Sequence, residues 1–257
     1  MADAGANRLA DKAAIVTGAA RGIGKAIVEA FAAEGAAVWC ADLHGGEAEA
    51  VAAAIRAGGG KAEGGYCDVR STDSVLDAVD AAVEAFGGLD ILVANAATLT
   101  PAATVEDLDE ADWTQALAVN LTGAFHLCKH GIPHLKRAGG GSVILTASQM
   151  ARVGNPGSAA YCTTKGGLVQ LARVMALDHA ADGIRVNTLS PGGTATDRLF
   201  SRHGSPELAE EEWGKPMHPL GRLGRPEEMA KGAVFLASAE SSFMTGADLL
   251  MDGGYSA

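Results

Sequence analysis

The chain has little positive charge and few cysteines, and each shortage excludes a class of protein. Its 257 residues carry 20 Lys and Arg against 31 Asp and Glu, which gives a formal net charge of -11. Nucleic-acid binding depends on basic surface that neutralises phosphates, so this composition argues against it. The four cysteines lie far apart without a CxxC pair, which indicates a reduced chain (Cys40, Cys67, Cys128 and Cys162).

Long apolar segments are also missing. No stretch approaches the roughly 20 uncharged apolar residues that a membrane-spanning helix needs. The first twelve residues are small and polar, with Asp3 and Asp11, and contain no apolar signal core. We therefore expect a cytoplasmic protein that neither spans a membrane nor binds nucleic acid.

Internal repeats, charge blocks and Pro/Ser-rich linkers are absent too, so we expect one domain over 1–257, which is long enough for a substantial α/β core. Strand-like and helix-like segments alternate along it. The expected strands are 13–17, 36–42, 61–67, 91–94, 142–146, 185–189 and 248–251. The expected helices are 22–34, 45–57, 71–86, 109–138 (bent at Pro133), 158–181 and 226–237.

This alternation predicts a Rossmann-type, doubly wound fold, with a seven-stranded parallel sheet and helices on both faces. Ligands bind beyond the carboxyl ends of the strands in such sheets. The stretch 196–220 shows no continuous helical period, and we expect it to be an irregular segment that covers the substrate.

The first expected strand runs into a glycine-rich turn. Gly18, Gly22 and Gly24 have the spacing GxxxGxG, with Arg21 and Ile23 between them. Glycine permits a positive φ and lets the backbone approach a pyrophosphate closely, and the helix that follows offers free N–H groups. The turn therefore predicts dinucleotide binding, although a glycine-rich turn by itself can be only a tight turn.

Asp42 closes the second expected strand, 24 residues after Gly18. A carboxylate at this place accepts hydrogen bonds from the adenosine ribose hydroxyls and repels a 2′-phosphate. Arg21 points the other way, because a basic residue in the turn favours that phosphate. We judge the aspartate decisive and expect NAD as the cofactor.

Two further strand ends carry polar residues. Asp68 and Val69 follow the third strand, where Asp68 can accept from the adenine amine and Val69 offers its backbone. A cap for the next helix is the alternative role of Asp68. Asn95 follows the fourth strand and faces the same edge.

Tyr161 and Lys165 stand four residues apart on the helix expected at 158–181, so they share one face. Free tyrosine has a pKa of about 10, which is too high for a base at neutral pH. A nearby ammonium and an oxidised nicotinamide both favour the phenolate. Ser148 lies just past the fifth strand, at the ligand-binding edge. A Tyr–Lys pair alone is common on helices; together with Ser148 and the glycine turn it predicts proton transfer.

These residues together resemble the short-chain dehydrogenase/reductase family, and the resemblance covers nearly the whole chain. The carrying residues are Thr17 to Gly24, Asp68-Val69, Asn95-Ala96, Asn120, Ser148, Tyr161 with Lys165, and Pro191-Gly192 with Thr196. The resemblance implies an NAD(P)-dependent oxidoreductase with four roles. Tyr161 would be the general acid/base, Ser148 would bind the substrate oxygen, Lys165 would bind the nicotinamide ribose, and Asn120 would complete a water-linked proton relay.

The same resemblance implies a homotetramer whose subunits meet through the two long helices expected at 109–138 and 158–181. It also implies that Thr196 binds the carboxamide or the pyrophosphate of the cofactor. The sequence departs from the family's usual pattern at two places. Ala94-Asn95-Ala96-Ala97 stands where Asn-Asn-Ala-Gly is common, and Thr194 replaces a branched apolar residue. Thr194 can still offer its backbone to the nicotinamide carboxamide.

The substrate pocket is the least defined part of the sequence. We expect Gln149, Met150, Phe200 and Trp213 to line it, which suits a medium-sized secondary alcohol or ketone. A carboxylate on the substrate is a further option, for which three arginines are candidates (Arg152, Arg198 and Arg202).

Three other interpretations stay open. An NADPH-dependent 3-ketoacyl-type reductase ranks lower, because a net charge of -11 disfavours an acidic carrier protein. A non-catalytic dinucleotide-binding regulator on the same fold is a different class. His126, His130 and His134 have metal-ligand spacing, but no carboxylate or cysteine completes a set, so we expect no metal site.

Overall fold

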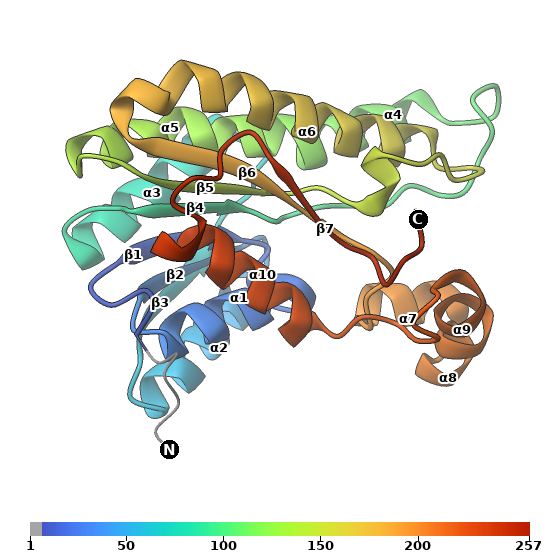
Figure 1. Ribbon diagram of the computed structural model, residues 1–257, viewed down its shortest axis with the longest axis horizontal. Coiled ribbons are helices and arrows are strands. Elements are labelled where there is room, and N and C mark those ends of the chain that lie inside the picture. Colours follow the sequence, from blue (N-terminus) through green and yellow to red (C-terminus); the bar gives the residue numbers. More distant parts are fainter. Residues whose placement is uncertain (1–6) are drawn as a thin grey trace.

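The computed structural model describes residues 7–257, which form one seven-stranded parallel sheet between two layers of helices (Figure 1). The strand order is β3-β2-β1-β4-β5-β6-β7 and reverses between β1 and β4, where such sheets bind ligands. The strands are β1 (Ala13–Thr17), β2 (Ala37–Asp42), β3 (Lys61–Tyr66), β4 (Ile91–Ala94), β5 (Gly141–Thr146), β6 (Ile184–Pro191) and β7 (Asp248–Met251).

The helices alternate with these strands as the sequence predicts. They are α1 (Gly22–Ala33), α2 (Gly45–Ala57), α3 (Thr72–Phe86), α4 (Glu110–Ala116), α5 (Gly123–Arg137), α6 (Ala159–His179), α7 (Asp197–His203), α8 (Pro206–Ala209), α9 (Lys215–Met217) and α10 (Pro226–Ala237). β1, α2, β4, α10 and β7 have the expected bounds, and most other ends differ by one or two residues. Within residues 7–257, no helix is long and apolar enough to cross a membrane.

Two apolar cores lie on the two faces of the sheet. α1, α2 and α10 cover one face, while α3, α5 and α6 cover the other (Figure 1). Successive side chains of a strand point to opposite faces, so Ala13 and Ile15 join one core and Ala14 and Val16 the other. This burial on both sides explains why β1 reads as a continuous apolar run.

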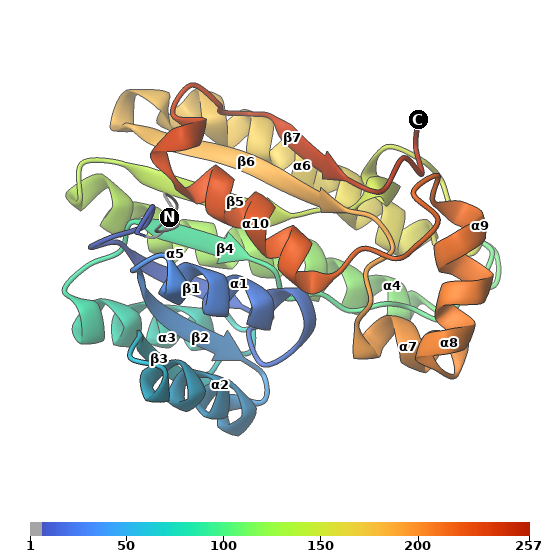
Figure 2. The ribbon, with the colours of Figure 1, turned by 60° about the horizontal axis from the view of Figure 1, so that its bottom comes forward.

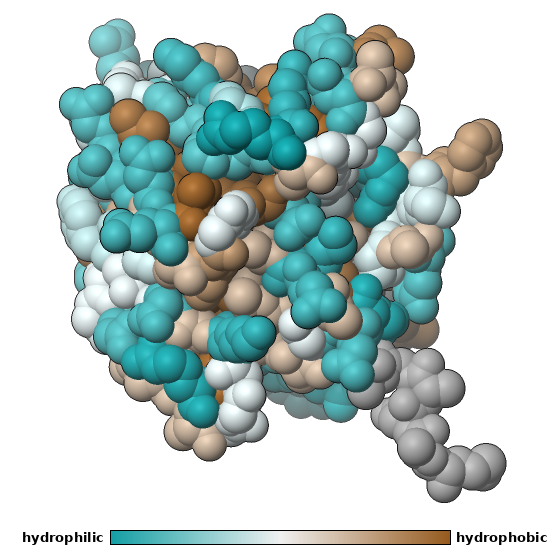
Figure 3. All heavy atoms as spheres, turned by 90° about the vertical axis from the view of Figure 1, so that its left-hand side faces the viewer, coloured by the Kyte–Doolittle hydropathy of each residue, from teal (hydrophilic) through white to brown (hydrophobic). Residues whose placement is uncertain are grey.

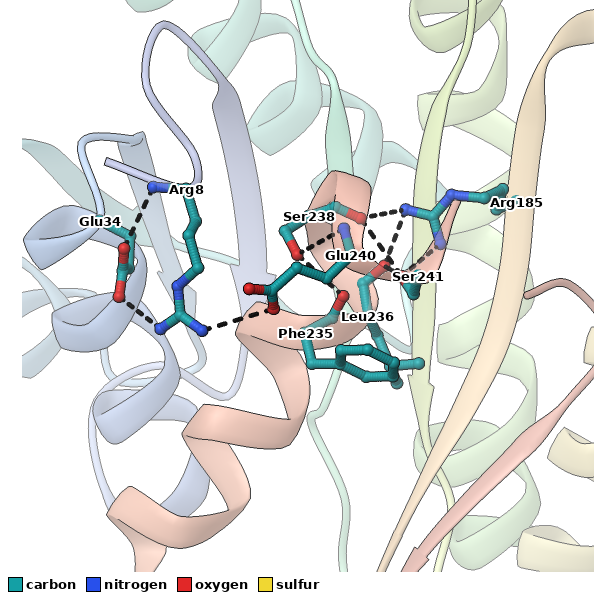
Figure 4. Close-up of polar contacts among 8 residues, drawn as sticks. All are labelled: Arg8, Glu34, Arg185, Phe235, Leu236, Ser238, Glu240 and Ser241. Atoms are coloured by element: carbon teal, nitrogen blue, oxygen red, sulfur yellow. Dashed lines mark hydrogen bonds and ion pairs between the residues drawn. The ribbon is translucent and has the colours of Figure 1, made fainter. Parts of the chain in front are cut away.

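Arg185 of β6 holds the carboxyl end of α10 against the sheet (Figure 4). Its Nη2 donates to the carbonyls of Leu236 (2.9 Å) and Ser238 (3.1 Å), and its Nη1 donates to Ser241 Oγ (2.8 Å). The last carbonyls of a helix lack partners within the helix and carry its negative dipole end, so a guanidinium satisfies them well.

The helix expected at 109–138 is interrupted. α4 ends at Ala116, a π-helical turn runs from Leu117 to Thr122, and α5 then continues through Pro133. The break therefore falls at the π turn and not at the proline. The wider turn carries the buried Asn120, whose side chain binds backbone outside the helix.

The segment 196–220 was expected to be irregular, and this is wrong, because it is mostly helical. α7, α8, a π-helical turn (Glu210–Gly214) and α9 follow one another at the end of the molecule where the strands finish (Figure 2). Thr196 and Ser205 cap α7 and α8 by accepting from Leu199 N and Leu208 N. Each piece is too short to show a helical period in the sequence. At the opposite end, where the strands begin, hydrophilic side chains surround a central area of intermediate and hydrophobic ones (Figure 3).

Candidate active site

A cleft of about 890 Å³ opens at the carboxyl ends of the strands. Most of the site residues expected from the sequence line it: Gly18, Arg21, Gly22, Ile23, Asp42, Asp68, Val69, Asn95, Ser148, Gln149, Met150, Tyr161, Lys165, Thr194, Thr196 and Trp213. Gly24, Asn120 and Phe200 do not line it. Residues from the loops after six different strands are thus brought to one cavity.

The glycine turn after β1 needs its glycines for two reasons. Gly18 and Gly22 have φ angles of 68° and 56°, in the left-handed region that other residues rarely adopt. A Cβ on Gly24 would lie 2.0 Å from the Gly18 carbonyl oxygen, so Gly24 permits close packing of α1 behind the turn. α1 begins at Gly22 without a side-chain cap, which leaves its first N–H groups available to an anion.

Asp42 ties the glycine turn to the end of β2. Its Oδ2 accepts from Ala20 N and its Oδ1 from His44 N, each at 3.0 Å, and the residue is 9% exposed. A carboxylate oxygen has more than one acceptor site, so both oxygens can also accept from a ligand in the cleft. Arg21 pairs with Glu47 at 3.1 Å on the exposed rim, where such pairs contribute little to stability.

Asp68 and Asn95 are both held by the protein. Arg70 makes a two-point contact with Asp68, at 2.9 Å (Nε–Oδ1) and 2.6 Å (Nη2–Oδ2), and this hydrogen bonding lowers the pKa of the carboxyl group. Asn95 Nδ2 donates to the carbonyls of Thr17 (3.0 Å) and Gly18 (3.2 Å). Asn95 therefore joins the end of β4 to the glycine turn.

Ser148, Tyr161 and Lys165 face one another across the other half of the cleft. Ser148 Oγ accepts from Met150 N at 3.1 Å, which leaves its O–H free to donate. Lys165 is 2% exposed, and its Nζ donates to the Thr146 carbonyl at 2.6 Å. The same Nζ lies 5.6 Å from the centroid of the Tyr161 ring.

Burial has the largest effect on the pKa values of Tyr161 and Lys165. It lowers the pKa of Lys165 to about 7, and the charge of Arg198 acts in the same direction. Burial also raises the pKa of Tyr161, while Arg198 and the Ser148 hydroxyl oppose this increase. The sequence predicts that the Lys165 ammonium and an oxidised nicotinamide favour the phenolate together, and burial of the two side chains opposes the charged form of each.

Asn120 lies behind the cleft, with 1% of its surface exposed. Its Oδ1 accepts from Thr98 N (2.7 Å), and its Nδ2 donates to Thr98 O (3.0 Å) and Thr164 Oγ1 (3.3 Å). The side chain thus connects the loop after β4 to α6. Its partner on α6, Thr164, lies between Tyr161 and Lys165 in the sequence. The π turn is what points the Asn120 side chain there.

Sequence reasoning missed a cluster that supports the loop after β6. Gly193 N donates to Nε2 of the buried His218 at 3.1 Å, and a Cβ on Gly193 would lie 2.6 Å from Trp213 Nε1. Tyr255 stacks on Trp213, with ring centroids 6.0 Å apart, and packs against His218 at 5.7 Å. The adjacent pair Gly192-Gly193 is the one sequence signal of this close approach.

Of the four residues expected to line the substrate pocket, Gln149, Met150 and Trp213 line the cleft and Phe200 does not. Gln149 is buried, and its Oε1 has no hydrogen-bond partner among residues 7–257, nor does Thr146 Oγ1. Both residues line the cleft, but these two oxygens are themselves buried. Met217 and Leu220 of the segment 196–220 face solvent, and Phe200 does not line the cavity.

The three histidines of α5 point to different partners. His126, His130 and His134 contact Val69 O (3.0 Å), Thr72 Oγ1 (2.8 Å) and Arg137 Nη2 (2.6 Å), respectively. The described residues contain no group of His, Cys, Asp or Glu side chains placed to hold a metal ion.

The glycine cradle and the uncapped start of α1 fit a dinucleotide lying across the cleft. The turn would hold its pyrophosphate and Asp42 its adenosine ribose. When bound, such a group would supply the hydride acceptor or donor of the reaction.

Comparison with known proteins agrees with this geometry. The family model described as Enoyl-(Acyl carrier protein) reductase matches residues 18–256. D-threitol dehydrogenase of Mycolicibacterium smegmatis is 41% identical over 255 residues, covering 96% of this chain and 94% of the relative. Cis-4-hydroxycyclohexanecarboxylate dehydrogenase of Sinomonas cyclohexanicum is 41% identical over 248 residues, covering 96% and 98%.

One solved structure is a short-chain type dehydrogenase/reductase from Mycobacterium marinum. It has a TM-score of 0.88 and 37% identity to this chain, and the match covers 96% of each. The shared fold therefore extends over nearly the whole chain.

Proposed function

Because this chain belongs to the short-chain dehydrogenase/reductase family and is an oxidoreductase with a dinucleotide cofactor, we propose that it oxidises secondary alcohols with NAD. One observation carries the proposal: Ser148, Tyr161 and Lys165 line the same cleft as the glycine turn. The appearance of reduced nicotinamide with a panel of secondary alcohols tests it.

The proposed roles follow from the hydrogen-bond donors and the charges that each side chain can offer to a ligand. Ser148 donates its O–H to the substrate oxygen, and the Tyr161 phenolate takes the hydroxyl proton as the hydride leaves the carbinol carbon. Lys165, when protonated, favours the phenolate and binds the nicotinamide ribose. Asn120 positions Thr98 and α6 and connects the site to the proton relay that family resemblance implies.

The names of the relatives suggest the size of the substrate. D-threitol, cis-4-hydroxycyclohexanecarboxylate and cyclohexanol dehydrogenases act on small alcohols, and the last, from an Acinetobacter species, is 34% identical to this chain. The alternative is an NADPH-dependent 3-ketoacyl-type reductase, which Arg21 at the cleft rim favours. We rank it second because Glu47 already pairs with that arginine.

The first prediction concerns cofactor choice. We expect kcat/KM for NAD to exceed that for NADP at least tenfold, about 1.4 kcal/mol, because Asp42 would face the 2′-phosphate. Asp42→Ala should lower the ratio of kcat/KM for NAD to that for NADP, and Arg21→Ala should raise it. Steady-state kinetics with both cofactors measures the effect.

Asp42→Ala also removes the bonds to Ala20 N and His44 N, so its activity with NAD should fall as well. The ratio of the two cofactors is therefore the readout, and not the absolute rate. Equal kcat/KM for NAD and NADP in the native enzyme would show that Arg21 outweighs Asp42.

The second prediction concerns the segment 196–220, which we propose covers the substrate. α7 has seven residues, and α8, the π turn and α9 form one continuous helical run over 206–217; both runs are short enough to depend on tertiary contacts for their stability. Trp213 lines the cleft, and Arg198 Nη2 reaches across it to Ala97 O at 2.5 Å. Amide hydrogens here should exchange faster than those of the central strands, and slow down once cofactor and substrate bind. Protection equal to that of β4 without ligand would make the segment a fixed wall.

We also propose a homotetramer, as the family resemblance implies. α5 and α6 leave an apolar groove on the surface, lined by Leu121, Phe125, Leu171 and Val174, with Phe125 48% exposed. Analytical ultracentrifugation should find four chains per particle; a monomer at micromolar concentration would refute this.

A further inference from the structure

Four arginines line the cleft, and they differ in their partners. Arg21 pairs with Glu47, and Arg70 with Asp68. Arg198 and Arg202 have no carboxylate partner within residues 7–257. Two exposed guanidinium groups that line the cleft without a carboxylate partner are available to an anionic ligand.

Both residues belong to α7, four positions apart, so they lie on one face of the helix. Arg198 donates one hydrogen bond to Ala97 O, which leaves most of its five donors free. Its charge lowers the pKa of both Tyr161 and Lys165, which places it at the reacting end of the cleft.

Arg152, the third sequence candidate for a carboxylate, does not belong to this group. Its Nε lies 2.7 Å from Oδ2 of Asp248, and it does not line the cleft. The structure thus separates one paired arginine from two that face the cavity.

We propose that Arg198 and Arg202 form an anion-binding subsite, so that the alcohol oxidised here carries a carboxylate. The inference rests on the proposed function and names its substrate class, a hydroxy acid. Guanidinium groups bind carboxylates through parallel charge-assisted hydrogen bonds, which orients the substrate as well as attracting it. A fixed carboxylate would hold the carbinol carbon at a set distance from Tyr161.

The competing role for these arginines is to bind the cofactor's pyrophosphate. α7 begins near the glycine turn, since a Cβ on Gly22 would lie 3.3 Å from Thr196 Cγ2. The two roles predict different results when the arginines are removed. If the arginines bind the substrate, the binding of a carboxylate weakens. If they bind the pyrophosphate, the binding of the cofactor weakens.

The binding test uses two compounds that cannot react. Cyclohexanecarboxylate and cyclohexanecarboxamide are titrated by calorimetry into the enzyme saturated with NAD. We expect the carboxylate to bind at least tenfold more tightly than the amide, with added NaCl reducing the difference. The double variant Arg198→Ala/Arg202→Ala should abolish the difference. Arg137→Ala removes the same charge at the far end of α5 and should preserve it.

The kinetic test compares 4-hydroxycyclohexanecarboxylate with its carboxamide. Since Arg198 also affects the pKa of Tyr161, the readout is the ratio of kcat/KM for acid over amide, in which that effect cancels. The ratio should exceed ten in the native enzyme and fall to about one in the double variant. Arg202→Gln alone should lower the ratio, which provides a test if the double variant does not fold.

The outcomes separate the two proposals. Carboxylate binding that depends on the arginines, without turnover of any alcohol, would leave the subsite standing and refute the proposed reaction. Turnover with an acid-to-amide ratio near one in the native enzyme would refute the subsite alone. A raised Kd for NAD with unchanged carboxylate preference in the double variant would assign the arginines to the pyrophosphate and overturn the inference.

Discussion

Tyr161→Phe should lower kcat by roughly 10²- to 10⁴-fold, the usual contribution of a general acid/base group. The phenyl ring keeps the packing of α6 against the cleft, and only the hydroxyl that exchanges the proton is lost. The dissociation constant for NAD should therefore stay close to its native value. Steady-state kinetics on the best alcohol and a cofactor titration measure both quantities.

Tyr66→Phe is the matched control for this substitution. Tyr66 ends β3, is exposed and does not line the cleft, so its kcat should be native. A loss below tenfold in Tyr161→Phe, with the control unchanged, would remove Tyr161 from the proton transfer.

Lys165→Met should shift the pH midpoint of alcohol oxidation upward and weaken cofactor binding. Oxidation needs the Tyr161 phenolate, which becomes more abundant as pH rises, and burial already raises the pKa of Tyr161. The proposed role of Lys165 is to supply one charge that stabilises the phenolate, and its loss leaves Arg198, whose charge acts to lower the pKa of Tyr161. A pH profile identical to that of the native enzyme would show that Lys165 does not act on Tyr161.

The same substitution should not reduce stability in acid. Burial lowers the pKa of Lys165 from 10.5 to about 7, so the folded chain binds this proton less tightly than the unfolded chain does. The charged residue therefore destabilises the fold at pH values below 7, and this penalty fades as pH rises to 10.5. At pH 6, Tm of Lys165→Met should be at or above the native value. Lys231→Met, on the exposed side of α10, should change neither the pH profile nor Tm.

Most of the fold could be predicted because its signals are local. β1 and β4 are short apolar runs buried on both faces, and the caps and glycines mark where helices begin and end. The π turn at Leu117–Thr122 has no such local signal in the sequence, because it places Asn120 against the backbone of another loop, at Thr98. The helical runs 197–203 and 206–217 of the segment 196–220 escape sequence prediction because both are short and a π turn interrupts the period of the second.

The candidate site was predictable where residues follow strand ends, as Asp42, Asp68 and Ser148 do. Their partners were not predictable, because Arg70, Ala20 and Met150 meet them only after the loops are folded. The pKa of Lys165 was beyond sequence reasoning for the same reason: its direction depends on burial.

His218 and Tyr255 show the same limit at longer range. They come from the end of the segment 196–220 and from the residues after β7, yet they meet behind Gly193 and Trp213. No spacing in the sequence connects these four residues. Only the tertiary contacts show that the tail supports a wall of the cleft.

The central claim is that the Ser148, Tyr161 and Lys165 cluster performs NAD-linked oxidation of a secondary alcohol. The most direct measurement follows reduced nicotinamide as the native enzyme meets a panel of secondary alcohols, with NAD and with NADP, beside Tyr161→Phe. We predict turnover of at least one alcohol, faster with NAD, and almost none in the variant. Binding of NAD without hydride transfer to or from any alcohol or ketone of the panel would contradict the account and favour a non-catalytic dinucleotide-binding protein.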